Sequence, residues 1–386
     1  MSAPAARVSS KGIDVGVVAR LDLVLLAVPL ALSGLGFVMI YASTKTRLGQ
    51  AGLNQLSYVE KQGIAAVLGL VVMVAAIAID YRRLRDVWPL VYIAWLPVLL
   101  AVLAIGQRRN GTQAWFQVGP MQFEPSEITK IVVIVAIAGY CHQHRGDMTP
   151  WRLGSAVALA AVPIGLVLAQ NDLGSAIVIL VCASASLVVA GIKVQHAAVL
   201  ILVGLSVVGA AFATGTVKAY RIDRLTTFLD QESAATLPAA KQTQAEYTLT
   251  QAQIAIASGG FTGAGLFHGM RTNLGDVPEQ HTDFIFTAVA EQLGFIGGAT
   301  VIALYGLLVW RLWRIALTAA DLFGLLLAIG ILAMFTIHVF ENIGMTMGIM
   351  PITGIPLPFL SYGGSSLIGS FLGIGVAANV HMRRFS

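Results

Sequence analysis

The chain has 386 residues, of which 57% are hydrophobic and 11% are charged, and its formal net charge is +5. Soluble domains carry about 25% charged residues, so the composition excludes an ordinary soluble fold and a large soluble module. The positive charge fits basic loops beside membrane spans and gives no case for a nucleic-acid partner.

Apolar stretches recur along the whole chain, and most of them reach about 17 residues, the length that a helix needs to cross a bilayer core. They lie at 23–42, 63–79, 87–105, 131–141, 153–169, 173–192, 197–213, 284–310, 322–340 and 367–380. The sequence therefore predicts an all-α polytopic membrane protein with about ten transmembrane helices. Residues 1–20 are expected to form an N-terminal tail, and residues 21–386 a single membrane domain.

Lysine and arginine residues in the short loops predict which side of the membrane each loop occupies. If the N-terminus is cytoplasmic, the short inner segments carry many more of these residues than the short outer loops. This bias predicts that both termini are cytoplasmic. It also places the long segment 215–282, between the seventh and eighth spans, outside the cell, and loops of this length are usually functional.

The same alternation of spans places the polar blocks of the sequence together on the outer side. These blocks lie at 110–130, 170–176, 215–282 and 341–366. The inner loops are short and basic, which is typical of membrane anchors. Any active site is therefore expected to open to the outside.

The fourth span has an apolar run of only residues 131–141, so its helix is predicted to start earlier, at Pro125. Proline is favoured in the first turn of a helix, where its missing N–H would have had no partner. Glu127 and Lys130 are three residues apart and share one face of this helix. They are either a structural ion pair in a dry place or part of the active site, since charges inside a membrane usually pair and often mark function.

The long outer segment contains one stretch with helical spacing of apolar residues, Gln244–Ser258, which Gly259 and Gly260 end. We expect an amphipathic helix on or partly in the outer leaflet. The glycine-rich run that follows can bring backbone close to a ligand. The alternative is a surface loop with a packed helix and no ligand.

Asp283 lies where this segment meets the eighth span. It is either the N-cap of the helix that begins FIF, or a partly desolvated carboxylate that can act as a base. Glu291 lies about two turns deeper and is expected to be buried with a partner or neutral. His281 and His338 have no second metal ligand at a suitable spacing, which favours hydrogen-bonded packing residues.

The stretch 341–366 is dense in proline and glycine, including Pro351, Pro356 and Pro358. We expect it to be non-helical, because proline removes backbone donors and clashes with a helix. It is predicted to form an outer loop or a re-entrant segment that lines a polar cavity, and not to face lipid.

These blocks resemble the SEDS family (shape, elongation, division and sporulation), membrane glycosyltransferases that polymerise peptidoglycan. The most specific block is NIGMTMGIMPITGIPLPFLSYGGSS, at 342–366, and HTDFIF, PSEITK, NDLGSA and QAQIAIASGG are similar to other blocks of the family. The resemblance covers almost the whole chain. Within the family, GIPLPFLSYGG is more similar to the elongation branch than to the division branch.

The resemblance implies roles for individual residues. Asp283 falls on the essential aspartate of the family, which implies the catalytic role, although a capping role is compatible with it. Trp115 falls on the tryptophan of an extracellular loop, and Asp172 falls on the acidic residue of the DLG block. Glu127 and Lys130 fall on the paired charges of the fourth helix.

Two positions depart from the family pattern. Ala114 stands where similar members carry arginine, directly before the tryptophan, and Ala264 stands where they often carry lysine in the glycine-rich loop. These departures leave open which basic residues face the pyrophosphate of the substrate. The available substitutes are Arg108, Arg109, Arg224 and Arg271.

The resemblance also implies a reaction on lipid II, a disaccharide-pentapeptide on undecaprenyl pyrophosphate. The 4-hydroxyl of an acceptor sugar attacks the anomeric carbon of the donor with inversion, and Asp283 takes the proton. Basic side chains or a divalent cation, Mg²⁺ or Mn²⁺, stabilise the leaving pyrophosphate. The implied location is the bacterial cytoplasmic membrane, among membrane lipids, with a class B penicillin-binding protein (a transpeptidase) as partner.

Two other functions compete with this one. A flippase or transporter for the same lipid predicts polar residues deep inside several helices and a second polar cluster on the inner face. A scaffold that only holds a penicillin-binding protein predicts that Asp283 is dispensable. The short, basic inner loops favour chemistry on one side of the membrane.

Overall fold

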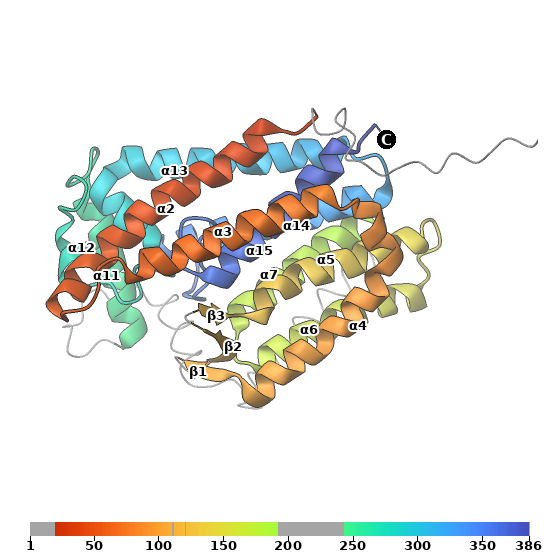
Figure 1. The fold of residues 1–386 in the computed structure, drawn as a ribbon, viewed down its shortest axis with the longest axis horizontal. Helices are drawn as coiled ribbons and strands as arrows, with labels where there is room; N and C mark the ends of the chain where they lie inside the picture. The colour runs from red at the N-terminus through yellow and green to blue at the C-terminus, as the bar shows by residue number, and fades with distance from the viewer. Residues whose placement is uncertain (1–19, 110–111, 120, 192–242, 386) are drawn as a thin grey trace, which may run out of the picture.

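The computed structural model describes residues 20–109, 112–119, 121–191 and 243–385, and the predicted seventh span lies outside them. Every other predicted apolar stretch coincides with a helix (Figure 1). Seven of the described helices are long and apolar enough to cross a membrane, while the total of ten spans stays a prediction. The helices are α2 (Leu23–Gln50), α3 (Ser57–Ala78), α4 (Tyr81–Ile105), α5 (Pro125–Gln143), α6 (Pro150–Ala169), α7 (Leu173–Val189), α11 (Gln244–Ser258), α12 (Met270–Leu274), α13 (Ile285–Leu317), α14 (Leu322–Met347) and α15 (Gly364–Met382).

A small antiparallel sheet between α4 and α5 corrects the all-α prediction. Its strands, in the order β1-β2-β3, are β1 (Gln107–Arg109), β2 (Thr112–Val118) and β3 (Met121–Phe123). The β2 sequence, TQAWFQV, is rich in threonine, aromatic and valine residues, which favour strands. Gly119 follows β2 with a φ of +58°, a left-handed conformation that glycine adopts without strain.

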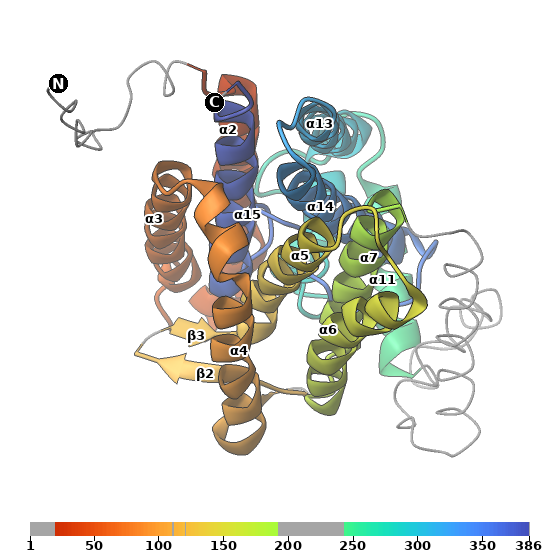
Figure 2. The same cartoon turned by 90° about the vertical axis from the view of Figure 1, so that its right-hand side faces the viewer.

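The helices differ in how far they are covered by the rest of the protein. In α15, 83% of the most apolar window is buried, against 22% in α3 and α4. Nearly every residue of α5 is also buried. Figure 2 shows α5 and α15 in the middle of the bundle, between α3, α4 and α14. The charges of α5 therefore lie inside the protein and do not face lipid.

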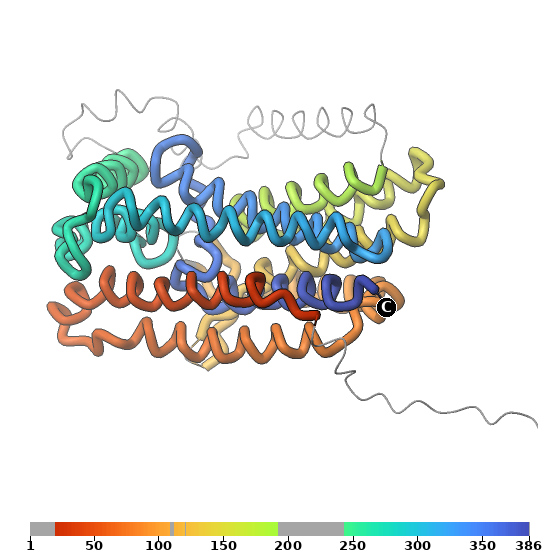
Figure 3. Tube along the Cα trace, turned by 90° about the horizontal axis from the view of Figure 1, so that it is seen from above, coloured from red at the N-terminus to blue at the C-terminus, as the bar shows by residue number. Residues whose placement is uncertain are grey.

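The polar blocks predicted to share one side of the membrane meet at one end of the bundle, here called the sheet end. The amide of Gln113 donates to Gln170 O (3.0 Å), and the amide of Tyr362 donates to His281 O (2.9 Å). At the opposite end, Asn379 Nδ2 donates to the carbonyls of Ala76 and Ile77. Figures 1 and 3 show α11 and α12 toward one extremity of the bundle and the C-terminus at the other.

The proline- and glycine-rich stretch is irregular over a shorter range than predicted. α14 continues through Met347 and ends at Gly348, whose φ of 78° is left-handed, so residues 341–347 are helical. The irregular part, 348–363, buries Ile355, Leu357 and Leu360. It therefore packs inside the protein, which agrees with the prediction that it does not face lipid.

Helix α13 is interrupted at Gly294, which has φ 65° and ψ −161°. In an unbroken helix, the carbonyls of Glu291 and Gln292 would accept from the amides four residues later. Here they accept instead from the amides of Ala264 (2.9 Å) and Gly265 (3.0 Å), which belong to the glycine-rich loop. The loop thus fills the break in the helix with backbone hydrogen bonds.

We expect Gly294→Ala to destabilise the protein by about 3 kcal/mol or more, because an L-residue is strained there. Its Cβ would also lie 2.3 Å from the amide nitrogen of Gly263. The matched control is Gly306→Ala in the same helix, where a Cβ meets nothing within 4 Å. Thermal unfolding of the purified variants measures both effects. Equal unfolding midpoints for the two variants would contradict the role assigned to the break.

Candidate functional site

Helix α5 begins at Pro125, as predicted, and presents its first turn at the sheet end. Glu127 Oε1 accepts from Lys130 Nζ at 2.8 Å, and the two side chains are only 6% and 1% exposed. The predicted pairing of these charges is therefore confirmed. The pair contributes to the fold because each charge is costly to bury without the other.

His338 of α14 completes the environment of Lys130. Its Nδ1 lies 2.6 Å from Met334 O, and its Nε2 lies 3.0 Å from Lys130 Nζ. A carbonyl oxygen only accepts, so Nδ1 carries the proton and Nε2 accepts from the lysine. His338 is a hydrogen-bonded packing residue, as predicted. Its contact with Lys130, 208 residues away in the chain, could not be predicted from local spacing.

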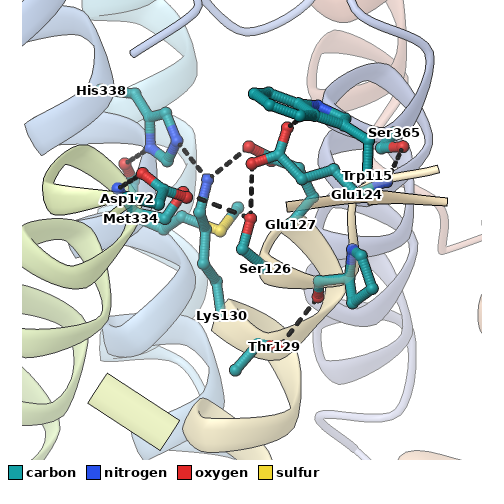
Figure 4. A network of polar contacts seen from close by, with 12 residues as sticks. Trp115, Glu124, Ser126, Glu127, Thr129, Lys130, Asp172, Met334, His338 and Ser365 are labelled. Atoms are coloured by element: carbon teal, nitrogen blue, oxygen red, sulfur yellow. Dashed lines mark hydrogen bonds and ion pairs between the residues drawn. The ribbon is translucent and has the colours of Figure 1, made fainter. Parts of the chain in front are cut away.

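Glu124, just before α5, is at the centre of a second set of contacts that sequence reasoning missed (Figure 4). Trp115 Nε1 donates to its Oε2 at 3.0 Å, and Ser126 Oγ donates to its Oε1 at 2.6 Å. Its amide donates to Ser365 Oγ at 2.8 Å, at the start of α15. Glu124 thus fixes the indole ring of Trp115 against the ends of α5 and α15. An acidic residue directly before a helix-starting proline was the available signal.

The carboxyl group of Glu124 is surrounded by other acidic groups. Burial, together with the negative charges of Asp172 and Glu127, raises the pKa of Glu124 to about 8. Burial disfavours the charged form, and nearby like charges add to that effect. Its surroundings therefore favour the neutral form of this carboxyl more than water favours it for an exposed glutamate.

Asp172 is the N-cap of α7, where its Oδ1 accepts from the amide of Ser175 at 3.0 Å. Ser175 Oγ in turn donates to Ser126 Oγ at 3.4 Å, which brings α7 to the first turn of α5. Asp172 Oδ2 is buried and has no hydrogen-bond partner in the described part of the chain. This oxygen is an acceptor that a bound ligand can use.

One prediction, that Asp283 is the N-cap of α13, is wrong. The helix begins at Ile285, its N-cap is Phe284, and no side chain caps it. The reason is a preceding turn in which the amides of Thr282, Asp283 and Phe284 all donate to Glu279 O, at 3.2, 3.1 and 3.4 Å. This turn delays the start of the helix by one residue and places Phe284, not Asp283, at the N-cap position.

The irregular segment 348–363 approaches Asp283 closely. Asn342 Nδ2 donates to Asp283 O and to Ile355 O, both at 2.7 Å. A Cβ at Gly354, whose φ is 76°, would lie 3.2 Å from Asp283 Oδ2. A Cβ at Gly174, in the first turn of α7, would lie 2.7 Å from Ile355 Cγ1. The short stretch 353–355 therefore contacts both Asp283 and the helix that Asp172 caps.

The four basic candidates do not all come from one segment, and two of them, Arg108 and Arg109, share β1. Arg271 of α12 forms an ion pair with Asp276 (Nη1 to Oδ2, 2.9 Å). Arg108 is exposed in β1. Arg109 is in the same strand, but its side chain lies outside the described residues, as does the whole of Arg224. The structure therefore places two of the four side chains, and neither is part of the contacts around Glu124.

Glu291 is buried with partners, as predicted. Its carboxylate accepts from the amides of Arg271 (2.7 Å) and Thr272 (3.0 Å) and from Thr272 Oγ1 (2.6 Å). These donors belong to the first residues of α12, so Glu291 fixes this short helix to α13. The backbone of Arg271 is thereby held at the sheet end.

A divalent cation held by the protein alone would need several acidic, histidine or cysteine side chains close together. Within residues 20–109, 112–119, 121–191 and 243–385, no group of three or more His, Cys, Asp or Glu residues is arranged to hold a metal ion. These residues do not by themselves form a metal site.

We expect the Glu127–Lys130 pair to be energetically coupled. Glu127→Gln and Lys130→Met should each cost about 3–5 kcal/mol, because each leaves a buried charge unpaired, and the double variant should cost less than their sum. The matched control is the exposed pair Arg85–Asp86, where the same cycle should give at most about 1 kcal/mol. The free energy of unfolding measures both cycles. Additive losses at Glu127 and Lys130 would contradict the pairing.

Comparisons with known proteins agree with this arrangement. A family model described as FtsW/RodA/SpoVE cell cycle protein matches residues 22–385. The peptidoglycan glycosyltransferase MrdB of Escherichia coli (strain K12) is 36% identical over 373 residues, 95% of this chain and 94% of that protein. A chain of a peptidoglycan synthase complex, solved to show the structural coordination of polymerization and crosslinking, has a TM-score of 0.78 and 31% identity, covering 95% of this chain and 99% of that one.

The rod shape determining protein RodA of Thermus thermophilus has a similar crystal structure, with a TM-score of 0.68 and 31% identity, covering 95% of this chain and 98% of that one. The matches extend over nearly the whole chain. The chain is therefore a multi-pass protein of the bacterial cytoplasmic membrane. It belongs to the FtsW/RodA/SpoVE family, which is the SEDS family that its sequence resembles.

Proposed function

We propose that this protein is a peptidoglycan glycosyltransferase that polymerises lipid II into glycan strands, with Asp283 as the general base. The observation that carries the proposal is the position of Asp283. It directly precedes the N-cap residue of α13, Asn342 joins its backbone to Ile355, and a side chain at Gly354 would crowd its carboxylate. The name of MrdB, a peptidoglycan glycosyltransferase, supports the reaction class.

In the proposed reaction, the 4-hydroxyl oxygen of the acceptor sugar attacks the anomeric carbon of the donor. The bond between that carbon and the pyrophosphate oxygen breaks, and the configuration at the carbon inverts. The hydroxyl proton passes to the Asp283 carboxylate, so that the attacking oxygen gains electron density as the new bond forms. Undecaprenyl pyrophosphate leaves with the electron pair of the broken bond.

The remaining polar side chains bind and orient the substrate in this proposal. Asp172 Oδ2, which is buried without a partner among the described residues, accepts from a hydroxyl or amide N–H of lipid II. Trp115, held by Glu124, offers an indole ring to the sugar. The Glu127–Lys130 pair lies in the first turns of α5 and is also assigned to substrate binding.

The leaving pyrophosphate gains negative charge, so cationic groups stabilise it. Arg108 and Arg271 are the described candidates, and Arg109 and Arg224 remain candidates from the sequence. A divalent cation, Mg²⁺ or Mn²⁺, stays a proposal. Mg²⁺ is commonly bound by one or two carboxylates together with substrate phosphates, an arrangement that needs no dedicated protein cage. No step of the mechanism above depends on it.

A scaffold and a flippase are the alternatives. The buried polar contacts around Glu124 and Lys130 collect at the sheet end, on the first turns of α5 and α7, which favours chemistry at one membrane face. We place this end outside the cell and both termini in the cytoplasm. We also assign the protein to cell-wall elongation, supported by the block GIPLPFLSYGG and by the similarity to a rod shape determining protein.

The partner is a class B penicillin-binding protein, whose transpeptidase domain cross-links the new strands. The similarity to a chain of a synthase complex that coordinates polymerization and crosslinking supports this proposal. The segments 107–124, in which Val118 is exposed, and 215–282 are the surfaces assigned to the partner's outer domain, and its single helix is assigned to α13 and α14. Contact there shifts the population toward the form competent for catalysis.

Orientation can be tested by thiol labelling of intact cells. A cysteine in place of Thr112, at the sheet end, should react with a membrane-impermeant reagent, and a cysteine in place of Arg83, at the opposite end, should not. The natural thiols Cys141 and Cys182 are free but buried, so the parent protein provides a low background. Labelling at position 83 but not at 112 would reverse the orientation.

Asp283→Asn should abolish polymerisation of labelled lipid II by the purified protein, because an amide cannot accept the proton. The variant should still fold, since asparagine has nearly the same size and shape as aspartate and can accept the same hydrogen bonds through its Oδ1. The control, Asp86→Asn, makes the same change at an exposed position of the opposite end and should leave the rate unchanged. Polymerisation by Asp283→Asn at the parental rate would favour the scaffold. Adding a chelator to the parental assay tests the divalent cation.

Co-purified partner should raise the polymerisation rate. Val118→Lys should reduce this activation without reducing the basal rate, because Val118 is exposed and remote from Asp283 in the chain. An unrelated single-span membrane protein serves as the control for the presence of an added helix. Equal rates with and without every class B penicillin-binding protein of the same cell would contradict the activation.

A further inference from the structure

The end of the bundle opposite the sheet brings together arginines from both ends of the described chain. Arg20 precedes α2 and Arg384 follows α15, and their Cζ atoms lie 5.6 Å and 4.7 Å from the centroid of the Phe385 ring. Phe385 is 71% exposed. Two guanidinium charges that share one exposed ring repel each other, so the arrangement favours a bound anion.

The acidic residues near these arginines are already used. Asp22 is buried, accepts from the first amides of α2 and pairs with Arg311 of α13. Asp80 pairs with Arg383 at 3.4 Å. Within the described residues, neither Arg20 nor Arg384 has an ion pair with an acidic side chain. The charged side chains described here therefore leave a positive balance around Arg20 and Arg384.

The same surface continues along α13 toward aromatic side chains. The Cζ atoms of Arg311 and Arg314 lie 5.4 Å and 5.9 Å from the centroid of the Trp310 ring. Trp310 and Trp313 are 49% and 47% exposed. Tryptophan side chains on the outside of membrane helices concentrate at the level of the lipid headgroups. The arginines are thus at the depth where a phosphate of a lipid would lie.

We propose that this surface, here called the arginine cluster, binds the headgroup of an anionic phospholipid. The guanidinium groups of Arg20, Arg314 and Arg384 donate to the phosphate oxygens in pairs, a geometry that lysine does not provide, while Arg311 stays paired with Asp22. The exposed rings contact the glycerol and the first acyl carbons, which a free phosphate ion lacks. Basic pockets between membrane helices commonly bind such headgroups. The arginine cluster consists of Arg20, Arg311, Arg314 and Arg384, with Trp310, Trp313 and Phe385.

The test uses the full-length protein in phosphatidylcholine nanodiscs that contain a minor fraction of brominated phosphatidylglycerol or of brominated phosphatidylcholine. Bromine quenches tryptophan fluorescence at short range, and Trp310 and Trp313 lie within the cluster. Trp151, which is exposed elsewhere, is replaced by Phe in every sample. Both leaflets contain the brominated lipid, so the result does not depend on the orientation or on the proposed enzymatic function.

We expect phosphatidylglycerol to quench more strongly than phosphatidylcholine. The double variant Arg20→Gln/Arg384→Gln should lose this preference by about fivefold for each guanidinium removed, from about 1 kcal/mol per charge near an anionic surface. The single variant Arg314→Gln, at an exposed position, should lose about fivefold of the same preference. It keeps the test valid if the double variant does not fold. The matched variant Arg83→Gln/Arg85→Gln removes equal charge from α4 and should keep the preference.

Three results would overturn the proposal. The first is an unchanged preference in both cluster variants. The second is an equal loss in the matched variant, which would mean that general surface charge attracts the lipid. The third is complete loss of the preference on adding inorganic phosphate at an ionic strength matched with chloride, which would mean that the cluster binds a soluble anion.

Discussion

The packing of the bundle depends on how the positive charge of Lys130 is satisfied. This side chain is almost completely buried, so its ammonium group needs hydrogen-bond acceptors from the protein. Glu127 supplies one acceptor from the same helix, and His338 supplies another from α14. The two contacts fix both the rotation of α5 and its position along α14. The contacts around Glu124 and Asp172 lie one turn above, and their geometry follows from that placement.

Features that depend on nearby residues could be predicted from the sequence. Helix α11 has the bounds that its apolar spacing indicated, Gln244–Ser258, because a capping box at its start and glycines at its end are local signals. The start of α5 at Pro125 follows the preference of proline for the first turn. The pairing of Glu127 with Lys130 follows from helical geometry alone, since residues three apart share a face.

Features that depend on distant contacts could not be predicted in this way. His338 contacts a lysine 208 residues away, and Asn342 contacts the backbone of Asp283 59 residues away. Neither distance has a signature in local spacing. The start of α13 was predicted one residue early because the pattern FIF is apolar, whereas the turn closed by Glu279 O decides where the helix begins. Glu124 was missed because its role depends on Trp115 in a sheet that the apolar pattern did not indicate.

The break in α13 also couples the position of the glycine-rich loop to that of Asp283. The loop that donates to Glu291 and Gln292 also accepts, through Gly260 O and the carbonyl that follows it, from the first two amides beyond Gly294. The loop is therefore hydrogen-bonded to the helix on both sides of the break, which restricts bending of the two halves of α13 relative to each other. Asp283 precedes the half before Gly294, which is about 13 Å long at 1.5 Å per residue. A displacement of the glycine-rich loop would consequently move this helical segment, and with it the position of Asp283.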